Sequence, residues 1–259
     1  TNAQERTIKE ISDDISLAKP MRRLVQGDVG SGKTVVAAVS MSISAKNNTQ
    51  SVLLCPTEVL AEQHFKNFSA WFKNSNIKIE LLTGKMPMSK RKGIYQDLED
   101  GVIDILIGTH AVFQDKVKMK NLGLVVVDEQ QRFGVKQRFD LVKKSSDQIM
   151  PHQLFMTATP IPRTLAMTIF ADLETSKIDE LPPGRKPVET LVYSDKKKDE
   201  IVKRLETVCK SGNQVFWLCT MIEESENLDV QAADEAKEWI KENLGKDIKI
   251  SLLANEGCL

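Results

Sequence analysis

Short apolar runs alternate with stretches of helical periodicity over the first two thirds of the chain. Runs rich in aliphatic residues predict β-strands at Leu24–Gln26, Val52–Cys55, Ile79–Leu82, Ile103–Ile107, Leu122–Val127 and Gln153–Met156. Apolar positions at helical spacing predict helices between them, at Thr34–Ala45, Val59–Phe72, Ser89–Asp100, Val135–Val142 and Pro162–Phe170. Strands that alternate with helices predict an α/β fold with a parallel sheet. The unbroken apolar residues Val125–Val127 are typical of a central strand that is buried on both faces.

The pattern changes at Leu181–Pro187, a segment with three prolines and one glycine. Such a segment cannot continue a helix or a central strand, so we expect a linker over residues 179–189. A second alternation follows it, with strands predicted at 190–193, 214–219 and 248–253 and helices at 197–210 and 230–243. We therefore expect a complete lobe over residues 1–178 and the truncated start of a second lobe over residues 190–259.

The overall charge gives no indication of a nucleic-acid partner. Lys+Arg and Asp+Glu number 36 each, so the net charge is zero and any such contact must be a local surface. No apolar run approaches the roughly 18 residues of a membrane span, and the first residues do not resemble a secretory signal. The four cysteines lack CxxC spacing, which favours reduced thiols over a disulfide framework or a zinc site. We expect a cytoplasmic protein with no membrane partner.

The clearest chemical motif is a phosphate loop, Gly27-Asp28-Val29-Gly30-Ser31-Gly32-Lys33-Thr34. It follows a predicted strand and opens a predicted helix, as the motif requires. Glycines let successive backbone N–H groups face phosphates, and the helix N-terminus adds a positive dipole. In this motif Lys33 would reach the β- and γ-phosphates of ATP, and the Thr34 hydroxyl would hold Mg²⁺. The alternative is a glycine-rich turn without a nucleotide.

A pair of acids, Asp128 and Glu129, follows the apolar strand that ends at Val127. The carboxyl ends of strands are where open α/β sheets bind ligands. Asp128 would contact Mg²⁺, and Glu129 would orient and deprotonate the attacking water. Taken alone the pair could equally be a solvated loop, but beside the phosphate loop the catalytic interpretation is favoured.

Two weaker signals accompany these motifs. Gln4 follows a helix N-cap pattern at Thr1 and could read the edge of adenine, although alone it is better explained as an exposed helix residue. Thr157 and Thr159 follow a predicted strand, and their hydroxyls could couple the acid pair to an opposite lobe. Without the other motifs, Thr159 followed by Pro160 is simply a capped helix start.

The order of these blocks resembles superfamily 2 helicases. Longer strings, at Asp128–Val135, Met156–Leu165 and Asp179–Pro187, are similar to the RecG family, which remodels branched and forked DNA in bacterial recombination and repair. The resemblance covers roughly residues 1–253. It implies a RecA-like lobe that uses ATP and Mg²⁺, with DNA contacts at Pro56, Thr57, Glu58, Thr83, Gly84, Gly108, Thr109 and His110. Each of these short loops, taken in isolation, would be read as a plain turn.

Two departures from the family pattern bear on activity. The family carries His as the fourth residue of the acid tetrad, at a position in the catalytic site where this chain has Gln131, and an amide cannot take up a proton. The resemblance also implies arginine fingers from a second lobe, whereas Arg204 is the single arginine of residues 188–259. We therefore expect a fragment of a helicase core, with the remainder of the helicase as a partner. Two alternative hypotheses remain: a catalytically idle nucleotide-binding remnant, and a phosphate-loop ATPase that does not act on nucleic acid.

Overall fold

The structure, a computed structural model, describes residues 1–17, 19–129, 150–159, 173–180, 184–185, 188–218, 226–245 and 247–251. The chain divides into two compact units, Thr1–Arg185 and Lys186–Leu259. The predicted linker over residues 179–189 spans this division.

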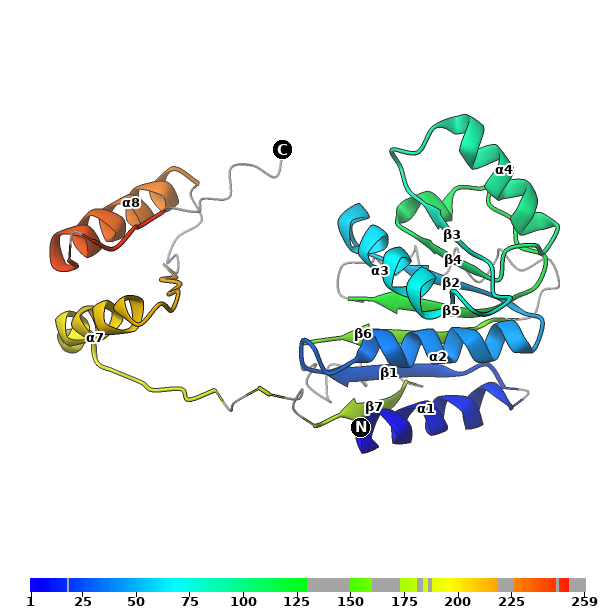
Figure 1. The fold of residues 1–259 in the computed structure, drawn as a ribbon, viewed down its shortest axis with the longest axis horizontal. Coiled ribbons are helices and arrows are strands. Elements are labelled where there is room, and N and C mark those ends of the chain that lie inside the picture. Colours follow the sequence, from blue (N-terminus) through cyan, green and yellow to red (C-terminus); the bar gives the residue numbers. More distant parts are fainter. Residues whose placement is uncertain are drawn as a thin grey trace. The chain divides into compact units, whose positions relative to one another are not determined.

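The first unit is built on a seven-stranded parallel sheet in the order β3-β4-β2-β5-β6-β1-β7 (Figure 1). Its strands are β1 (Arg22–Gly27), β2 (Gln50–Leu54), β3 (Ile79–Leu82), β4 (Ile105–Gly108), β5 (Leu122–Asp128), β6 (His152–Thr157) and β7 (Glu174–Ile178). All six strands predicted from apolar runs are confirmed. The sequence does not predict β7, because this edge strand is mostly polar and buries only Ser176 and Ile178.

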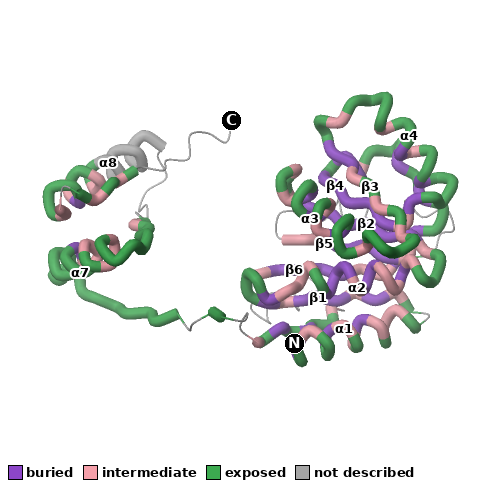
Figure 2. Tube along the Cα trace, in the orientation of Figure 1, coloured by how far each residue is buried: buried purple, intermediate pink, exposed green. Residues whose placement is uncertain are grey.

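Helices cover both faces of the sheet. Among the described residues of this unit, the helices are α1 (Asn2–Ile15), α2 (Lys33–Lys46), α3 (Glu58–Trp71) and α4 (Met88–Glu99), together with the 3-10 helix η1 (His110–Phe113). Buried residues of α1, α2 and α3 form one core with one face of the sheet, and those of α4 and η1 form a second core with the other face. Along β5, Leu124 and Val126 belong to the first core and Val125 and Val127 to the second. This alternation explains the unbroken apolar run, and buried positions follow the sheet in Figure 2.

The helices predicted near α2, α3 and α4 are confirmed to within a few residues at each end. For helix α1, the only indication in the sequence was an N-cap pattern at Thr1. The structure contains this cap, in which the side chain of Thr1 accepts a hydrogen bond from the N–H of Gln4. The helices predicted at 135–142 and 162–170 lie outside the described residues.

The second unit contains the 3-10 helix η3 (Asp195–Lys197), α7 (Lys198–Lys210) and α8 (Glu226–Asn243). The two predicted helices are confirmed, but the three predicted strands are wrong for the residues described, since 190–193, 214–218 and 248–251 are not strands. A strand needs a hydrogen-bonding neighbour, and apolar content alone does not supply one. Val192 and Leu218, which the sequence assigns to strands, are 95% and 86% exposed.

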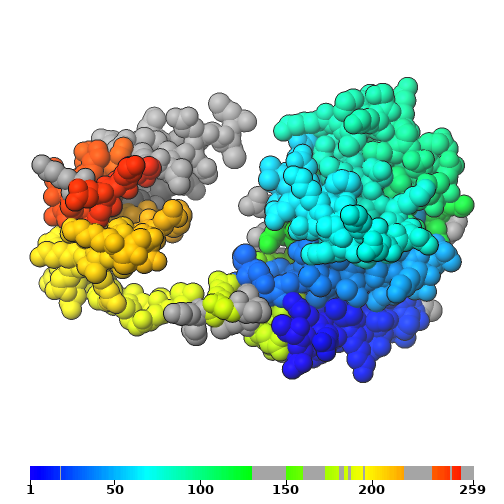
Figure 3. Space-filling view, in the orientation of Figure 1, coloured from blue at the N-terminus to red at the C-terminus, as the bar shows by residue number. Residues whose placement is uncertain are grey.

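Over the described residues, no helix combines the length and the apolar character that a membrane crossing requires. Cys55 and Cys209 are free thiols, and Cys55 is buried. The other two cysteines lie outside the described residues. Figure 3 shows the two units as space-filling surfaces.

Candidate functional site

The predicted motifs lie along one edge of the sheet. Because all seven strands are parallel, their carboxyl ends meet at the same edge, which is where open α/β sheets bind ligands. The phosphate loop follows β1, the acid pair closes β5, and Thr157 ends β6, so these three motifs share neighbouring strands. The loops that follow β2, β4 and β3 form the other half of this edge.

The phosphate loop has the backbone that its glycines allow. Gly30 and Gly32 have φ of 82° and 87°, a left-handed conformation that side chains disfavour. A Cβ atom on Gly32 would lie 2.1 Å from Nε2 of Gln4, so a larger residue would displace that side chain. Helix α2 begins directly after Gly32, which directs its first N–H groups toward the loop.

The loop fits a polyphosphate. Lys33 Nζ donates to the carbonyl oxygens of Gly27 and Asp28 at 2.7 and 2.9 Å, and phosphate oxygens could replace both acceptors. Ser31 Oγ is buried and has no hydrogen-bond partner among the described residues. Buried polar atoms are normally paired, so this hydroxyl is suited to a bound ligand.

The acid pair lies within electrostatic reach of the phosphate loop. Burial lowers the pKa of the Lys33 ammonium, while the negative charges of Glu129, Asp128 and Asp28 oppose that shift. Among the described residues, no group of three or more His, Cys, Asp or Glu side chains could hold a metal ion. Mg²⁺ is commonly bound by one or two protein oxygens together with substrate phosphates, and Thr34 and Asp128 could supply such oxygens.

Glu129 stands in an unusual backbone conformation. Its φ is 50°, in the left-handed region that non-glycine residues rarely adopt. Such conformations cost on the order of 1–3 kcal/mol and cluster at active sites. The conformation is therefore consistent with a functional role for this carboxylate, which stays a prediction. Gln131 lies outside the described residues.

Gln4 is held against the phosphate loop. Its Nε2 donates to the carbonyl oxygen of Ser31 at 2.8 Å, and its Oε1 accepts from the nitrogen of Thr1 at 3.0 Å. The amide therefore links the start of α1 to the phosphate loop and is not simply an exposed helix residue. Its proposed contact with adenine stays a prediction.

The two threonines after β6 contact each other. The hydroxyl oxygens of Thr157 and Thr159 are 3.0 Å apart, and the N–H of Thr159 donates to Thr157 Oγ1 at 3.2 Å. Thr157 is buried at the end of β6, next to the end of β5 that carries Asp128. The pair is thus placed beside the acid pair, and its proposed coupling role stays a prediction.

The three loops predicted to contact DNA lie side by side, because β3, β4 and β2 are neighbours. Gly108 ends β4, and a Cβ there would lie 2.5 Å from the carbonyl oxygen of Leu82, so this close approach requires glycine. Thr109 is buried, and His110, which opens η1, is exposed. Thr83 is buried at the end of β3.

Glu58, the first residue of α3, contacts the loop that follows β3. Its carboxylate accepts from the N–H of Lys85 at 3.2 Å and pairs with Lys85 Nζ at 3.1 Å, and these contacts with Lys85 lower its pKa. Arg91 donates to the carbonyl oxygen of Gly84 in the same loop. Thr57 caps α3 by accepting from the N–H of Leu60 at 3.3 Å. The Glu58 carboxylate is thus used within the protein, where it fixes the loop that follows β3.

Two residues that contact the site were not among the site residues predicted from the sequence. Arg185 pairs with the Asp28 carboxylate at 2.7 Å and donates to the carbonyl oxygen of Val29 at 3.0 Å, so an arginine within the predicted linker contacts the phosphate loop. His64 of α3 contacts the Asp128 carboxylate at 3.0 Å. A signal for His64 was present, because Ala61, His64 and Phe68 follow helical spacing on the buried face of α3.

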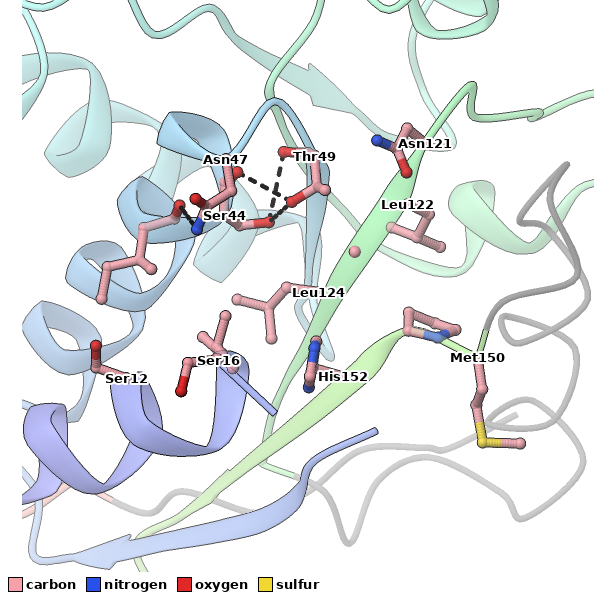
Figure 4. A pocket seen from close by; sticks show the side chains of 14 residues that line it. Ser12, Ser16, Ser44, Asn47, Thr49, Asn121, Leu122, Leu124, Met150 and His152 are labelled. Atoms are coloured by element: carbon pink, nitrogen blue, oxygen red, sulfur yellow. Dashed lines mark hydrogen bonds between the residues drawn. The ribbon is translucent and has the colours of Figure 1, made fainter. Parts of the chain in front are cut away.

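A cavity of about 470 Å³ lies elsewhere in this unit, near the last turns of α1 and α2 (Figure 4). Its lining includes Ser16, Asn47, Leu122 and His152, from the ends of those helices and the starts of β5 and β6. None of the predicted site residues lines it. The candidate site is therefore the carboxyl edge of the sheet and not this cavity.

Residues 1–168 match the DEAD/DEAH box helicase family, and the chain belongs to that family. Its relatives include the ATP-dependent DNA helicase RecG of Aquifex aeolicus (strain VF5), which is 50% identical over 254 residues, 98% of this chain and 32% of that protein. RecG of Haemophilus influenzae is 50% identical over 236 residues, 90% of this chain and 34% of that protein. RecG of Escherichia coli (strain K12) is 49% identical over 243 residues, 93% of this chain and 35% of that protein. The chain thus spans about a third of the length of these relatives.

Solved structures of helicases also match this chain. A structure of RecG bound to a three-way DNA junction matches with a TM-score of 0.75 and 37% identity, over 94% of this chain and 31% of that one. The helicase MrfA matches with a TM-score of 0.54 and 17% identity, over 94% of this chain and 39% of that one, which supports the fold alone. The predicted resemblance to RecG-type helicases and the RecA-like α/β fold are confirmed.

Proposed function

We propose that this chain is the ATP-binding lobe of an ATP-dependent DNA helicase or translocase core that acts on branched DNA. The observation that carries the proposal is the meeting of the phosphate loop and the acid pair at one edge of the parallel sheet, where the charges of Asp128 and Glu129 reach Lys33. Membership of the DEAD/DEAH box helicase family supports the use of ATP.

The phosphate loop and the acid pair form the nucleotide half of the sheet edge. In this proposal each residue of the nucleotide half has a distinct task. Lys33 exchanges the carbonyl oxygens of Gly27 and Asp28 for the β- and γ-phosphate oxygens. Thr34 and Asp128 hold Mg²⁺, which when bound neutralises charge on the phosphates. Glu129 orients the attacking water and accepts its proton.

The other half of the edge binds DNA phosphates. The loops after β2, β4 and β3 offer backbone N–H groups, and the exposed Thr57 adds a hydroxyl; such groups hold phosphates without a large net positive charge. This accounts for a DNA-binding lobe in a chain of zero net charge. A RecG relative that is 37% identical was solved bound to a three-way DNA junction, which supports branched DNA as the partner.

A second candidate, a nucleotide-binding lobe with little turnover of its own, is favoured by one observation. Arg204, the single arginine of residues 188–259, lies in α7 and donates to the hydroxyl of Tyr193 at 3.1 Å. It is therefore engaged as an exposed helix residue. An arginine finger is worth ~10³–10⁵ in rate, so turnover by this chain is expected to be slow.

ATP hydrolysis with and without forked DNA distinguishes these functions. We expect slow hydrolysis that DNA accelerates and that Glu129→Gln reduces by about 10²-fold or more, because the variant keeps the shape of the side chain but loses the base. Hydrolysis that DNA leaves unchanged would point to a phosphate-loop ATPase with another substrate. Hydrolysis no faster than in Glu129→Gln would identify the idle lobe.

A further inference from the structure

Helix α3 places a histidine against the acid pair. His64 Nε2 lies 3.0 Å from Oδ2 of Asp128, and the two side chains are only 9% and 14% exposed. Asp128 ends the central strand β5, whereas His64 is 64 residues earlier in the chain, so the contact is made by the fold and not by local sequence.

In the hydrogen bond between His64 and Asp128, the histidine is the donor. An ionised carboxylate has no proton to donate, so Nε2 must carry the hydrogen and Asp128 Oδ2 must accept it. Nδ1 of His64 is buried and has no hydrogen-bond partner among the described residues. The ring is therefore oriented by the bond to Asp128 and by its packing, which includes an edge contact to Phe68 at 6.5 Å between ring centroids.

The helix that carries His64 is itself well fixed. Ala61 and Phe68, one turn before and one turn after His64, are fully buried in the core beneath α3. The first turn of α3 begins at Thr57 and Glu58, in the loop that is proposed to bind DNA phosphate. Helix α3 thus spans from the DNA half of the edge to the carboxylate of the nucleotide half.

We propose that His64 is a positioning residue, which holds one oxygen of the Asp128 carboxylate so that the other oxygen faces the magnesium of the bound nucleotide. The inference rests on the proposed function, since it requires Asp128 to act on Mg²⁺. Groups that hydrogen-bond to metal-binding side chains fix their orientation, and loss of such a group commonly weakens metal affinity by about 10–100-fold.

The matched variants of His64 differ in whether the side chain can donate a hydrogen bond to Asp128 Oδ2. His64→Phe fills a similar space and keeps an aromatic ring beside Phe68, but it has no donor. His64→Gln carries an amide N–H that can reach about as far as Nε2, whereas the shorter amide of His64→Asn cannot. Asp128→Asn serves as the control that removes the charged oxygen itself.

The measurement is binding of ADP by calorimetry, first in EDTA and then with increasing Mg²⁺. We expect ADP affinity without Mg²⁺ to be the same in wild type and in the three His64 variants. His64→Phe and His64→Asn should need about 10–100-fold more Mg²⁺ than wild type to gain the tighter binding, and His64→Gln should restore most of the response. If His64→Phe does not fold, the Gln and Asn variants decide the question.

Two results would overturn the inference, and they can be told apart. If Asp128→Asn loses the Mg²⁺ response while His64→Phe, or in its place His64→Asn, keeps it unchanged, Asp128 acts on Mg²⁺ without help from His64, and the proposed function stands. If wild type binds no ADP under any condition, or if Asp128→Asn responds to Mg²⁺ as wild type does, the proposed nucleotide site or its metal-binding residue fails, and the inference fails with it.

Discussion

Lys33→Ala is expected to abolish most of the thermal stabilisation that MgADP gives to the first unit. A ligand at about 100 times its Kd stabilises the folded state by about 2.7 kcal/mol. For a unit of this size, such a free energy raises the Tm by about 5–10 °C. Lys33 Nζ donates hydrogen bonds to carbonyl oxygens of the phosphate loop. Lys33 is also the one residue of the motif with a cationic side chain, so Lys33→Ala removes the positive charge that would bind phosphate. Differential scanning calorimetry with saturating MgADP measures the shift.

Lys46→Ala is the matched control. Lys46 is an exposed lysine in the last turn of the same helix, α2, at the end remote from the phosphate loop. It should leave the ligand-induced shift as large as in wild type. Equal shifts in wild type and Lys33→Ala would show that the phosphate loop is not where the nucleotide binds.

The 259-residue chain is expected not to unwind DNA. Translocation requires two lobes that close over ATP and reopen after hydrolysis. The seven-stranded sheet forms one such lobe, and in the second unit the described residues form helices without strands. We expect no ATP-dependent strand separation on a forked duplex, while weak, salt-sensitive DNA binding should persist.

A version of the chain that is extended through a complete second lobe supplies the comparison. It should separate the strands of the same fork with ATP, and Lys33→Ala in that version should remove the activity. Strand separation by the 259-residue chain itself, lost in Lys33→Ala, would show that one lobe and the second unit already form a motor.

The sheet of the first unit could be predicted because its strands are buried on both faces. Val125–Val127 needs apolar residues in succession, since consecutive side chains enter two different cores. The edge strand β7 carries no such signal, because one side of it faces solvent. Its buried Ser176 is held by a hydrogen bond from Arg23 Nη1 at 2.8 Å, a partner that is distant in sequence.

The nucleotide motif could be predicted for a different reason. The phosphate loop is a local structure, in which glycine conformations and the helix start are set by adjacent residues. Contacts between distant segments could not be predicted in this way. The pairing of His64 with Asp128 and of Arg185 with Asp28 depends on which helix and which loop the fold brings to the sheet edge.

The second unit shows the limit of apolar patterning. Val192 and Leu218 have the residue types of strands, yet in the structure they are exposed, with no neighbouring strand among the described residues. Strand propensity expresses how well a side chain fits a paired, half-buried surface, so it predicts a strand only where a sheet is present to accept it.

Hydrogen–deuterium exchange on the 259-residue chain tests the central claim most directly, which is that one sheet edge carries a nucleotide half and a DNA half. A non-hydrolysable ATP analogue with Mg²⁺ should slow exchange in residues 27–34 and at Asp128 and Glu129. Forked DNA should instead slow exchange in the loops at 56–58, 83–85 and 108–110. Unchanged exchange at 27–34 with the nucleotide, or a DNA footprint that leaves all three loops unprotected, would contradict this assignment.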